Sequence, residues 1–268
     1  MNRFSFPDNG GDARGIQRKE ELQPRVKAMY CSTMNPGKLY LMPVPLGDGE
    51  TEAVIPKGTL EILYTLRFFA VEELRTARRY FRKAGITTPL EQLTLFELNE
   101  HTPEKDIPAL LQPVLDGNDM GLLSEAGVPA VADPGAALVA LAHRRHIEVV
   151  PLVGPSSLLL ALMASGFNGQ SFAFSGYLPV KPRERQQRIR QLEKRSITER
   201  QTQLFMETPY RNNALLNDLL ATCAPHTRLC IAAGITMPDA YIHTRTIAEW
   251  KKTPVDIHKK PCIFLLQG

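Results

Sequence analysis

The chain has 268 residues, of which 43% are hydrophobic and 22% charged, and its formal net charge is +4. This composition is ordinary for a globular enzyme of one or two domains, and the small net charge means that any strongly basic surface must be local. The most apolar run, residues 158–163, is far shorter than the about 20 residues that a bilayer span requires. The four cysteines form no C-x-x-C pair, so we expect reduced cysteines, no metal site and a cytoplasmic protein with no membrane association.

Residues 1–37 are polar, rich in Arg, Gly and Pro, and lack apolar periodicity. They are typical of a disordered tail, or of sequence that precedes a natural start at Met34. From residue 38, strand-like and helix-like runs alternate. We expect strands near 39–44, 68–72, 93–97, 119–124 and 147–152, with helices near 57–67, 74–84, 104–115, 135–145 and 156–165. Repeated units of this kind predict a mostly parallel sheet with helices on both faces.

Residues 172–179 are interpreted as a last strand of this first domain, ending in a linker. A smaller second α/β domain is predicted from strands near 202–206, 228–233, 240–245 and 262–266 and from helices near 184–197, 210–222 and 246–251. The predicted domains are therefore 38–178 and 179–268, both of the α/β class.

The turn-rich stretch 124–135 directly follows a predicted buried strand and contains two glycines, two prolines and two carboxylates. Similar strand exits occur at 43–47, 153–157 and 207–209. Because the carboxyl ends of parallel strands meet at one edge of a sheet, we expect these exits to form a ligand cleft. Within the stretch, Asp133 is expected to cap the following helix. No G-x-G-x-x-G, P-loop, G-x-S-x-G or H-E-x-x-H motif is present.

Four arginines recur at helical spacing in the predicted helix 74–84, namely Arg75, Arg78, Arg79 and Arg82. They share one helix face, which is either solvated and paired with nearby Glu side chains or a binding surface for phosphates or carboxylates. Residues 181–200 hold eight Lys and Arg against three Glu. A solvated helix is the ordinary interpretation of such a run, and contact with a nucleic-acid backbone is the alternative.

Five polar side chains lie at or just past predicted strand ends: Glu72, Glu73, Glu97, Asn99 and Glu125. A carboxylate in such a place can orient or deprotonate a hydroxyl group. It can equally cap a helix or pair with an arginine.

These motifs together resemble a known family. The run Ser124-Glu-Ala-Gly-Val-Pro-Ala-Val-Ala-Asp-Pro-Gly135 is similar to Ser-Asp-Ala-Gly-Thr-Pro-Leu-Ile-Ser-Asp-Pro-Gly, the signature of the 16S ribosomal RNA cytidine 2'-O-methyltransferase branch of the tetrapyrrole methylase superfamily. Further motifs match in order: Pro43-Val-Pro-Leu-Gly47, Gly154-Pro-Ser156, Ser165-Gly166, Gly176-Tyr-Leu-Pro179 and Glu207-Thr-Pro-Tyr-Arg211.

The resemblance implies two α/β domains, usually as a homodimer, with S-adenosylmethionine in the cleft between them. Carried over by position, it implies cofactor contacts at Pro45, Leu46, Gly47, Ser124, Gly127, Val128, Ala130, Val131, Ser156, Ser157, Met206, Glu207, Ala233, Gly234 and Thr236. For the acceptor side we expect Glu72, Arg75, Asn99 and Glu125 to be catalytic residues and Arg78, Arg79, Arg82 and Arg211 to contact the acceptor.

Departures from the family pattern concern the acceptor side. The chain has Glu72-Glu-Leu-Arg75 for Glu-Asp-Thr-Arg, Phe96-Glu-Leu-Asn99 for His-Glu-His-Asn, and Ala232-Ala-Gly-Ile-Thr236 for Arg-Glu-Leu-Thr-Lys. We therefore expect a methyltransferase that uses S-adenosylmethionine, with ribose of small-subunit ribosomal RNA as the acceptor. A tetrapyrrole acceptor and a non-catalytic, cofactor-binding RNA-associated protein are the alternatives.

Overall fold

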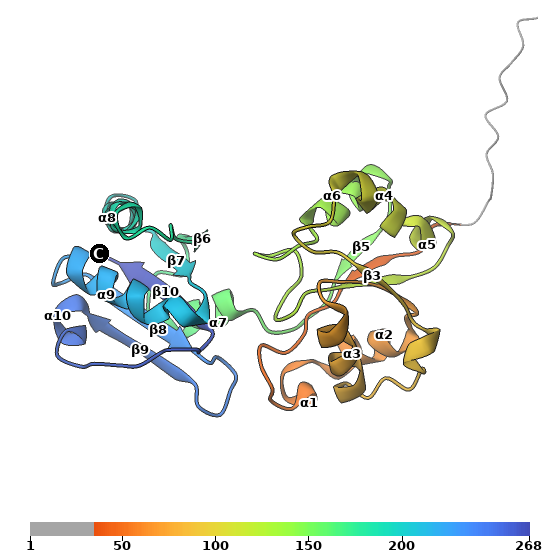
Figure 1. Ribbon diagram of the computed structural model, residues 1–268, viewed down its shortest axis with the longest axis horizontal. Helices are drawn as coiled ribbons and strands as arrows, with labels where there is room; N and C mark the ends of the chain where they lie inside the picture. Colours follow the sequence, from red (N-terminus) through yellow and green to blue (C-terminus); the bar gives the residue numbers. More distant parts are fainter. Residues whose placement is uncertain (1–34) are drawn as a thin grey trace, which may run out of the picture. The chain divides into compact units, whose positions relative to one another are not determined.

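The computed structural model describes residues 35–268; residues 1–34 of the predicted tail, including the predicted start at Met34, lie outside this range. The first sheet has five parallel strands in the order β3-β2-β4-β1-β5 (Figure 1). Its strands are β1 (Leu39–Leu41), β2 (Phe68–Val71), β3 (Thr94–Glu97), β4 (Met120–Leu123) and β5 (Val149–Pro151). The parallel sheet expected from the alternating pattern is confirmed.

Helices cover both faces of this sheet, as expected. Phe69 and Val71 pack with α2 and α3, whereas the intervening Ala70 packs with α4 and α6 on the opposite face. Figure 1 shows the two pairs of helices on opposite sides of the strands. The helices of this region are α1 (Thr51–Val54), α2 (Lys57–Thr65), α3 (Leu74–Lys83), α4 (Ile107–Leu110), α5 (Gln112–Leu115) and α6 (Ala136–Arg144). The alternation of side chains along a strand accounts for the two separate core layers.

The second sheet is mixed and has the order β6-β7-β10-β8-β9. Its strands are β6 (Phe172–Tyr177), β7 (Thr202–Met206), β8 (Arg228–Ala233), β9 (Tyr241–Thr246) and β10 (Cys262–Gln267). β6 pairs parallel with β7, and the other pairs are antiparallel. The expectation that residues 172–179 end the first domain is therefore wrong for this strand. A strand's own sequence pattern does not indicate which sheet it joins, because tertiary contacts decide its partner.

The second sheet is also covered on both faces. Helix α7 (Ser157–Ser165) packs on one face, against side chains that include Leu204 and Cys230. The other face carries α8 (Pro182–Thr198), α9 (Asn212–Thr222) and α10 (Ile247–Trp250). Trp250 is the only tryptophan of the chain, and its buried indole N–H donates a 2.8 Å hydrogen bond to the carbonyl of Leu229.

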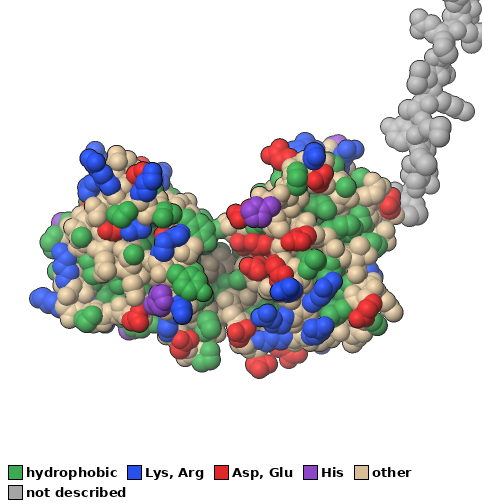
Figure 2. Space-filling view, viewed as in Figure 1, with side chains coloured by type: hydrophobic (Ala, Val, Ile, Leu, Met, Phe, Trp, Pro, Cys, Tyr) green, Lys and Arg blue, Asp and Glu red, His purple; other side chains and the backbone are tan. Residues whose placement is uncertain are grey.

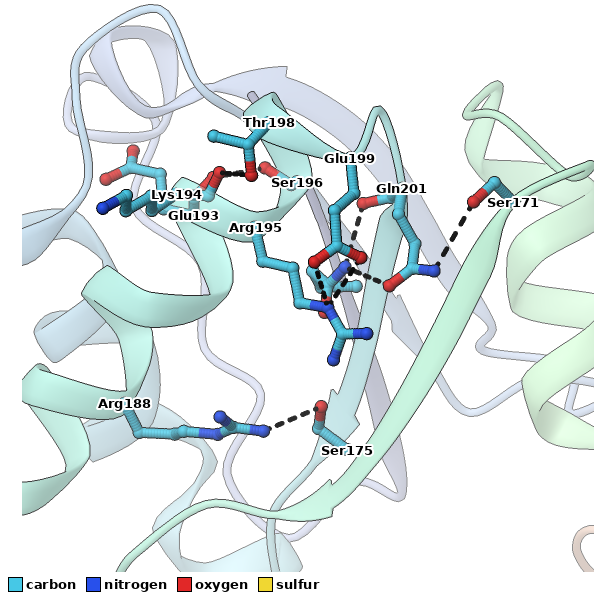
Figure 3. Close-up of polar contacts among 11 residues, drawn as sticks. Ser171, Ser175, Arg188, Glu193, Lys194, Arg195, Ser196, Thr198, Glu199 and Gln201 are labelled. Atoms are coloured by element: carbon cyan, nitrogen blue, oxygen red, sulfur yellow. Dashed lines mark hydrogen bonds and ion pairs between the residues drawn. The ribbon is translucent and has the colours of Figure 1, made fainter.

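Part of the basic run 181–200 is structural. Arg185 lies on the buried face of α8 and forms a 2.6 Å hydrogen bond with the carboxylate of Asp218. Figure 3 shows Arg195 turned toward Glu199, at 2.9 Å, and Arg188 reaching toward the hydroxyl of Ser175 on β6. Fewer positive charges of this run are therefore free to contact a nucleic acid than its eight Lys and Arg residues suggest.

Candidate active site

Three loops that were expected to form a cleft, 124–135, 43–47 and 153–157, follow three neighbouring strands of the first sheet, β4, β1 and β5. A two-hydrogen-bond bridge joins two of these loops. The N–H of Val44 donates to the carbonyl of Gly127 at 2.8 Å, and the N–H of Gly127 donates back at 3.1 Å. The loop after β1 is therefore fixed directly to the turn-rich stretch after β4.

These loops border a cavity of about 240 Å³ that also receives residues of the second sheet. The ends of β7 and β8 contribute Met206 and Ala232, and the beginning of β10 contributes Cys262. β10 runs antiparallel to both neighbours, so its first residues lie beside their last ones: Ile263 pairs with Met206, and Cys262 pairs with Ala233.

Most of the predicted cofactor residues line this cavity, namely Leu46, Gly127, Val128, Val131, Ser156, Ser157, Met206, Glu207 and Gly234. Pro45, Gly47 and Ser124 line a second cavity of about 140 Å³, which shares Leu46 and Ala126 with the first. Ser156 precedes α7 as its N-cap residue but makes no side-chain capping bond, so the helix does not use its hydroxyl.

Ala130, Ala233 and Thr236 line neither cavity. For Ala233 the reason is strand alternation, because it faces the helix-covered core of the second sheet while the preceding Ala232 faces the cavity. The sequence reasoning missed the lining residues Ala126, Ala132, Asp133, Leu158, Tyr177, Pro209, Ala232, Ile235, Met237, Pro261, Cys262 and Ile263. The matched motif 176–179 contained Tyr177 and was an available signal for it.

Left-handed backbone conformations gather in the loops beside the cavity. Ala130 and Ala132 both have φ of 64°, and Thr236 has φ of 71°. Such angles are uncommon for residues with a Cβ, and strained residues of this kind concentrate at ligand-binding and catalytic sites. The backbone of these loops is therefore held in shape by its surroundings.

Asp133 lines the cavity and does not cap α6, contrary to expectation. The N-cap residue is Gly135, with φ of 125° and no side-chain capping bond. Burial raises the pKa of Asp133 to about 6, and the negative charges of Glu72 and Glu125 add to this, while the nearby Ser124 hydroxyl opposes it. A carboxyl group with such a pKa exchanges protons near neutral pH.

Glu207 presents a buried carboxylate to the same cavity. Its Oε1 accepts hydrogen bonds of 2.7 Å from the N–H of Thr208 and from Nη2 of Arg211. Its Oε2 is buried and has no hydrogen-bond partner within residues 35–268. Burial alone would raise the pKa of Glu207, but the bonds from Arg211 and Thr208 bring it below its ordinary value. Arg211, predicted to contact the acceptor, thus holds an ionised carboxylate in place.

The predicted catalytic carboxylates are joined at the strand ends. The N–H of Glu125 donates to Oε2 of Glu72 at 3.1 Å. Burial raises the pKa of Glu72, the N–H of Glu125 opposes this, and the charges of Glu125 and Glu100 add to the rise. Asn99, by contrast, is engaged in its own turn, where it donates to Glu97 at 2.9 Å and lines neither cavity.

The arginine stripe of α3 is exposed, and Figure 2 shows Lys and Arg side chains gathered over this helix beside a group of acidic side chains. Within the described part of the chain, no carboxylate lies within 4.0 Å of the guanidinium groups of Arg75, Arg78, Arg79 or Arg82. The interpretation as a face neutralised by Glu partners therefore loses its support. Arg79 lines the second cavity together with Lys83.

Two structural absences bear on the class of site. No helix among the described residues is both long and apolar enough to cross a bilayer. The same residues contain no group of three or more His, Cys, Asp or Glu side chains arranged to hold a metal ion.

Comparison with known proteins identifies the family of the chain. Residues 38–251 match the family Tetrapyrrole (Corrin/Porphyrin) Methylases. The chain is 29% identical to Ribosomal RNA small subunit methyltransferase I of Escherichia coli O157:H7, over 87% of its own length and 78% of that protein. The corresponding protein of Vibrio cholerae is 31% identical, over 86% of this chain and 77% of that protein.

Solved structures show the same fold. The methyltransferase CobJ superposes with a TM-score of 0.58 at 19% identity, covering 87% of this chain and 94% of CobJ. Uroporphyrin III C-methyl transferase from Thermus thermophilus gives 0.53 at 16% identity, covering 86% of this chain and 97% of that one. The family match over residues 38–251 defines the chain as a methyltransferase. The chain belongs to the tetrapyrrole methylase family.

Proposed function

We propose that the protein binds S-adenosylmethionine in the 240 Å³ cavity and transfers its methyl group to a ribose 2'-hydroxyl of small-subunit ribosomal RNA. The observation that carries this proposal is the carboxylate of Glu207, whose Oε2 is buried without a partner in the described structure. The charged groups that line the cavity, Glu207 and Asp133, are acidic, and no Lys, Arg or His joins them. Such a lining favours a cationic ligand, and S-adenosylmethionine carries a sulfonium and an ammonium group.

The remaining lining suits the rest of that molecule. Apolar side chains such as Leu46, Val128 and Ile235 provide surface for an adenine ring, and the hydroxyls of Ser156 and Ser157 provide polar contacts. The left-handed loop backbones permit close approach of main chain to ligand. Bound there, S-adenosylmethionine supplies an electrophilic methyl group for in-line displacement.

The protein's own part in the reaction is to position the acceptor and remove its proton. Correct positioning of two reactants accounts for a large share of a displacement barrier. Asp133 lines the first cavity and Glu125 the second, while Glu72 lines neither and accepts a hydrogen bond from the N–H of Glu125. One of these carboxylates takes the proton of the ribose hydroxyl. The pKa of about 6 at Asp133, which burial raises, matches this role because a general base works best with a pKa near the operating pH. Arg75, at the beginning of α3, is proposed to orient the acceptor.

RNA is favoured as the acceptor for two reasons. The relatives that share about 30% identity are named as ribosomal RNA methyltransferases, and the unpaired arginines of α3 suit a polyanion. We further propose a homodimer, for which Leu159 and Met163 on α7 supply an exposed apolar surface. A ribosomal acceptor would place the reaction in the cytoplasm.

The decisive experiment supplies methyl-labelled S-adenosylmethionine with small-subunit RNA from a strain that lacks this protein and from its wild-type parent. The proposal expects label only in RNA from the deletion strain, on a cytidine ribose. Transfer to uroporphyrinogen or a precorrin, and not to RNA, would establish the tetrapyrrole alternative. Binding of the cofactor without transfer to either acceptor would establish the non-catalytic one.

A further inference from the structure

We propose that the second cavity is a phosphate subsite that binds a backbone phosphodiester of the acceptor RNA, with Arg79 and Lys83 as its cationic ligands. This inference rests on the proposed function. The cavity has a volume of about 140 Å³ and lies between α3 and the loops that follow β1 and β4. A phosphate bound in this cavity would have a defined position on the protein, whereas the arginine stripe alone does not define where the RNA strand lies.

The two cations are available to an anion. Arg79 and Lys83 lie one helical turn apart, so their side chains project from the same side of α3. Both are exposed, and no carboxylate within residues 35–268 forms an ion pair with either. Lys83 uses one of its three protons in a 2.6 Å hydrogen bond to the carbonyl of Asp48, and the other two remain for a ligand. A guanidinium and an ammonium side by side match the oxygens of a phosphodiester.

The cavity also contains a hydrogen-bond acceptor for a sugar hydroxyl. Glu125 lines it, and its Oε1 lies 3.3 Å from the hydroxyl of Thr76. That hydroxyl also lies 2.8 Å from Glu73 and has one proton, so it donates to one carboxylate at a time. The lining of the cavity therefore combines two cations with a hydrogen-bond acceptor, which are the groups that a ribose phosphate requires.

Its position relates the cavity to methyl transfer. Leu46 and Ala126 line both cavities, so an RNA strand held in the second lies directly beside the first. The carbonyl of Asp48 that Lys83 contacts belongs to the loop that carries Leu46. Arg75, Arg78 and Arg82 extend the positive charge over about 12 Å of helix, given a rise of about 1.5 Å per residue. An extended charge of this kind fits a polyanion better than an isolated carboxylate.

The test compares two pairs of substitutions on the same helix with equal loss of charge. Arg79→Gln with Lys83→Gln removes the cations that line the cavity. Arg78→Gln with Arg82→Gln removes exposed cations that line neither cavity. Arg144→Gln with Arg145→Gln, at the end of α6, serves as a control outside the binding machinery. Methyl transfer to small-subunit RNA and RNA retention on filters are measured over a range of salt concentrations, with saturating S-adenosylmethionine.

We expect the cavity pair to raise the KM and the Kd for RNA about tenfold and to reduce the salt slope of binding by about 1, because the cavity binds one phosphate and each phosphate contact contributes about 1. The affinity for S-adenosylmethionine and the kcat should stay within twofold. The Arg78 and Arg82 pair should raise the RNA Kd less than threefold, and the α6 pair should leave it unchanged. Lys83→Arg alone, which keeps a cation, should retain most of the RNA affinity.

Equal effects of the two α3 pairs would show that the helix acts as a diffuse positive surface and would overturn the subsite. An unchanged RNA Kd in the cavity pair would overturn it as well. If instead the wild-type protein transfers no methyl group to RNA, the proposed function itself fails, which is a different result from an active wild type with insensitive variants.

Discussion

Glu125 and Glu72 are tied by a 3.1 Å hydrogen bond from the backbone N–H of the first to the carboxylate of the second. The bond joins the ends of two adjacent strands, β4 and β2. Burial raises the pKa of Asp133 to about 6, and the negative charges of Glu72 and Glu125 add to this rise. Carboxyl groups from two loops, the one after β2 and the one after β4, therefore act together at this edge of the sheet.

The pKa of Asp133 has a measurable consequence for stability. Because its pKa in the folded protein, about 6, lies above the value of about 4 in an unfolded chain, the folded state binds more protons between these limits. Stability therefore falls as pH rises from about 4 to about 6. Asp133→Asn removes this dependence and should stabilise the protein by about 1 kcal/mol at pH 8, after allowance for partial exposure. Chemical denaturation of both proteins at pH 4 and pH 8 tests this, and an equal difference at both values would contradict it.

Glu207 should matter for cofactor affinity more than for folding. In Glu207→Gln the side chain keeps its size but loses its charge, so we expect the Kd for S-adenosylmethionine to rise between about 10-fold and 100-fold. Glu199→Gln is the matched control, since Glu199 also pairs with an arginine four residues away but lies on the surface of α8. Titration calorimetry compares the two variants. Equal affinities of the two variants for S-adenosylmethionine would show that Glu207 does not contact the cofactor.

The left-handed alanines provide a test of the loop conformation. Ala132→Gly should raise the free energy of unfolding by up to about 1 kcal/mol, because relief of about 1–2 kcal/mol of strain exceeds the entropic cost of glycine. Ala140→Gly, at an exposed position within α6, should lower it by about 1 kcal/mol. Urea titrations of both variants are the measurement. A loss of stability in both would show that the backbone at residue 132 is not left-handed.

Gly154 should not tolerate a side chain. A Cβ at this position would overlap the rigid ring of Pro43, which belongs to the loop after β1. Gly154→Ala should therefore cost about 1–3 kcal/mol of stability and weaken cofactor binding by separating the two loops. Gly58→Ala on α2 is the control, because its Cβ meets nothing within 4 Å and should be neutral or slightly stabilising. Thermal unfolding separates the two cases, and similar melting temperatures would count against the overlap.

The sequence was sufficient to predict the strands and most helices, because each apolar run is bounded by Gly, Pro or charged residues. It was also sufficient to predict residues that line one cavity together, since parallel strands with short exits leave little choice of edge. It was not sufficient to assign β6 to the second sheet, because its partner β7 follows it in the sequence only after the whole of α8. Nor did it reveal the lining by Pro261 and Cys262, because the antiparallel direction of β10 is set by its neighbours.

Side-chain roles were harder to predict than positions. The run Asp133-Pro-Gly135 has the pattern of a capped helix start. In the structure, however, Gly135 is the N-cap residue, and Asp133 lines the cavity instead. Arg185 was counted among surface charges, yet it occupies the same helix face as Ile189 and is buried against Asp218. In both cases tertiary contacts gave the side chain a role that the local sequence did not indicate.

The place of Trp250 makes this chain convenient for optical measurement. As the only indole, buried in the core of the second sheet and absent from the lining of both cavities, it gives a fluorescence signal that belongs to that sheet alone. Circular dichroism at 222 nm, by contrast, averages over helices of both halves. Following denaturation by both signals would therefore show whether the two sheets melt in one transition or in two.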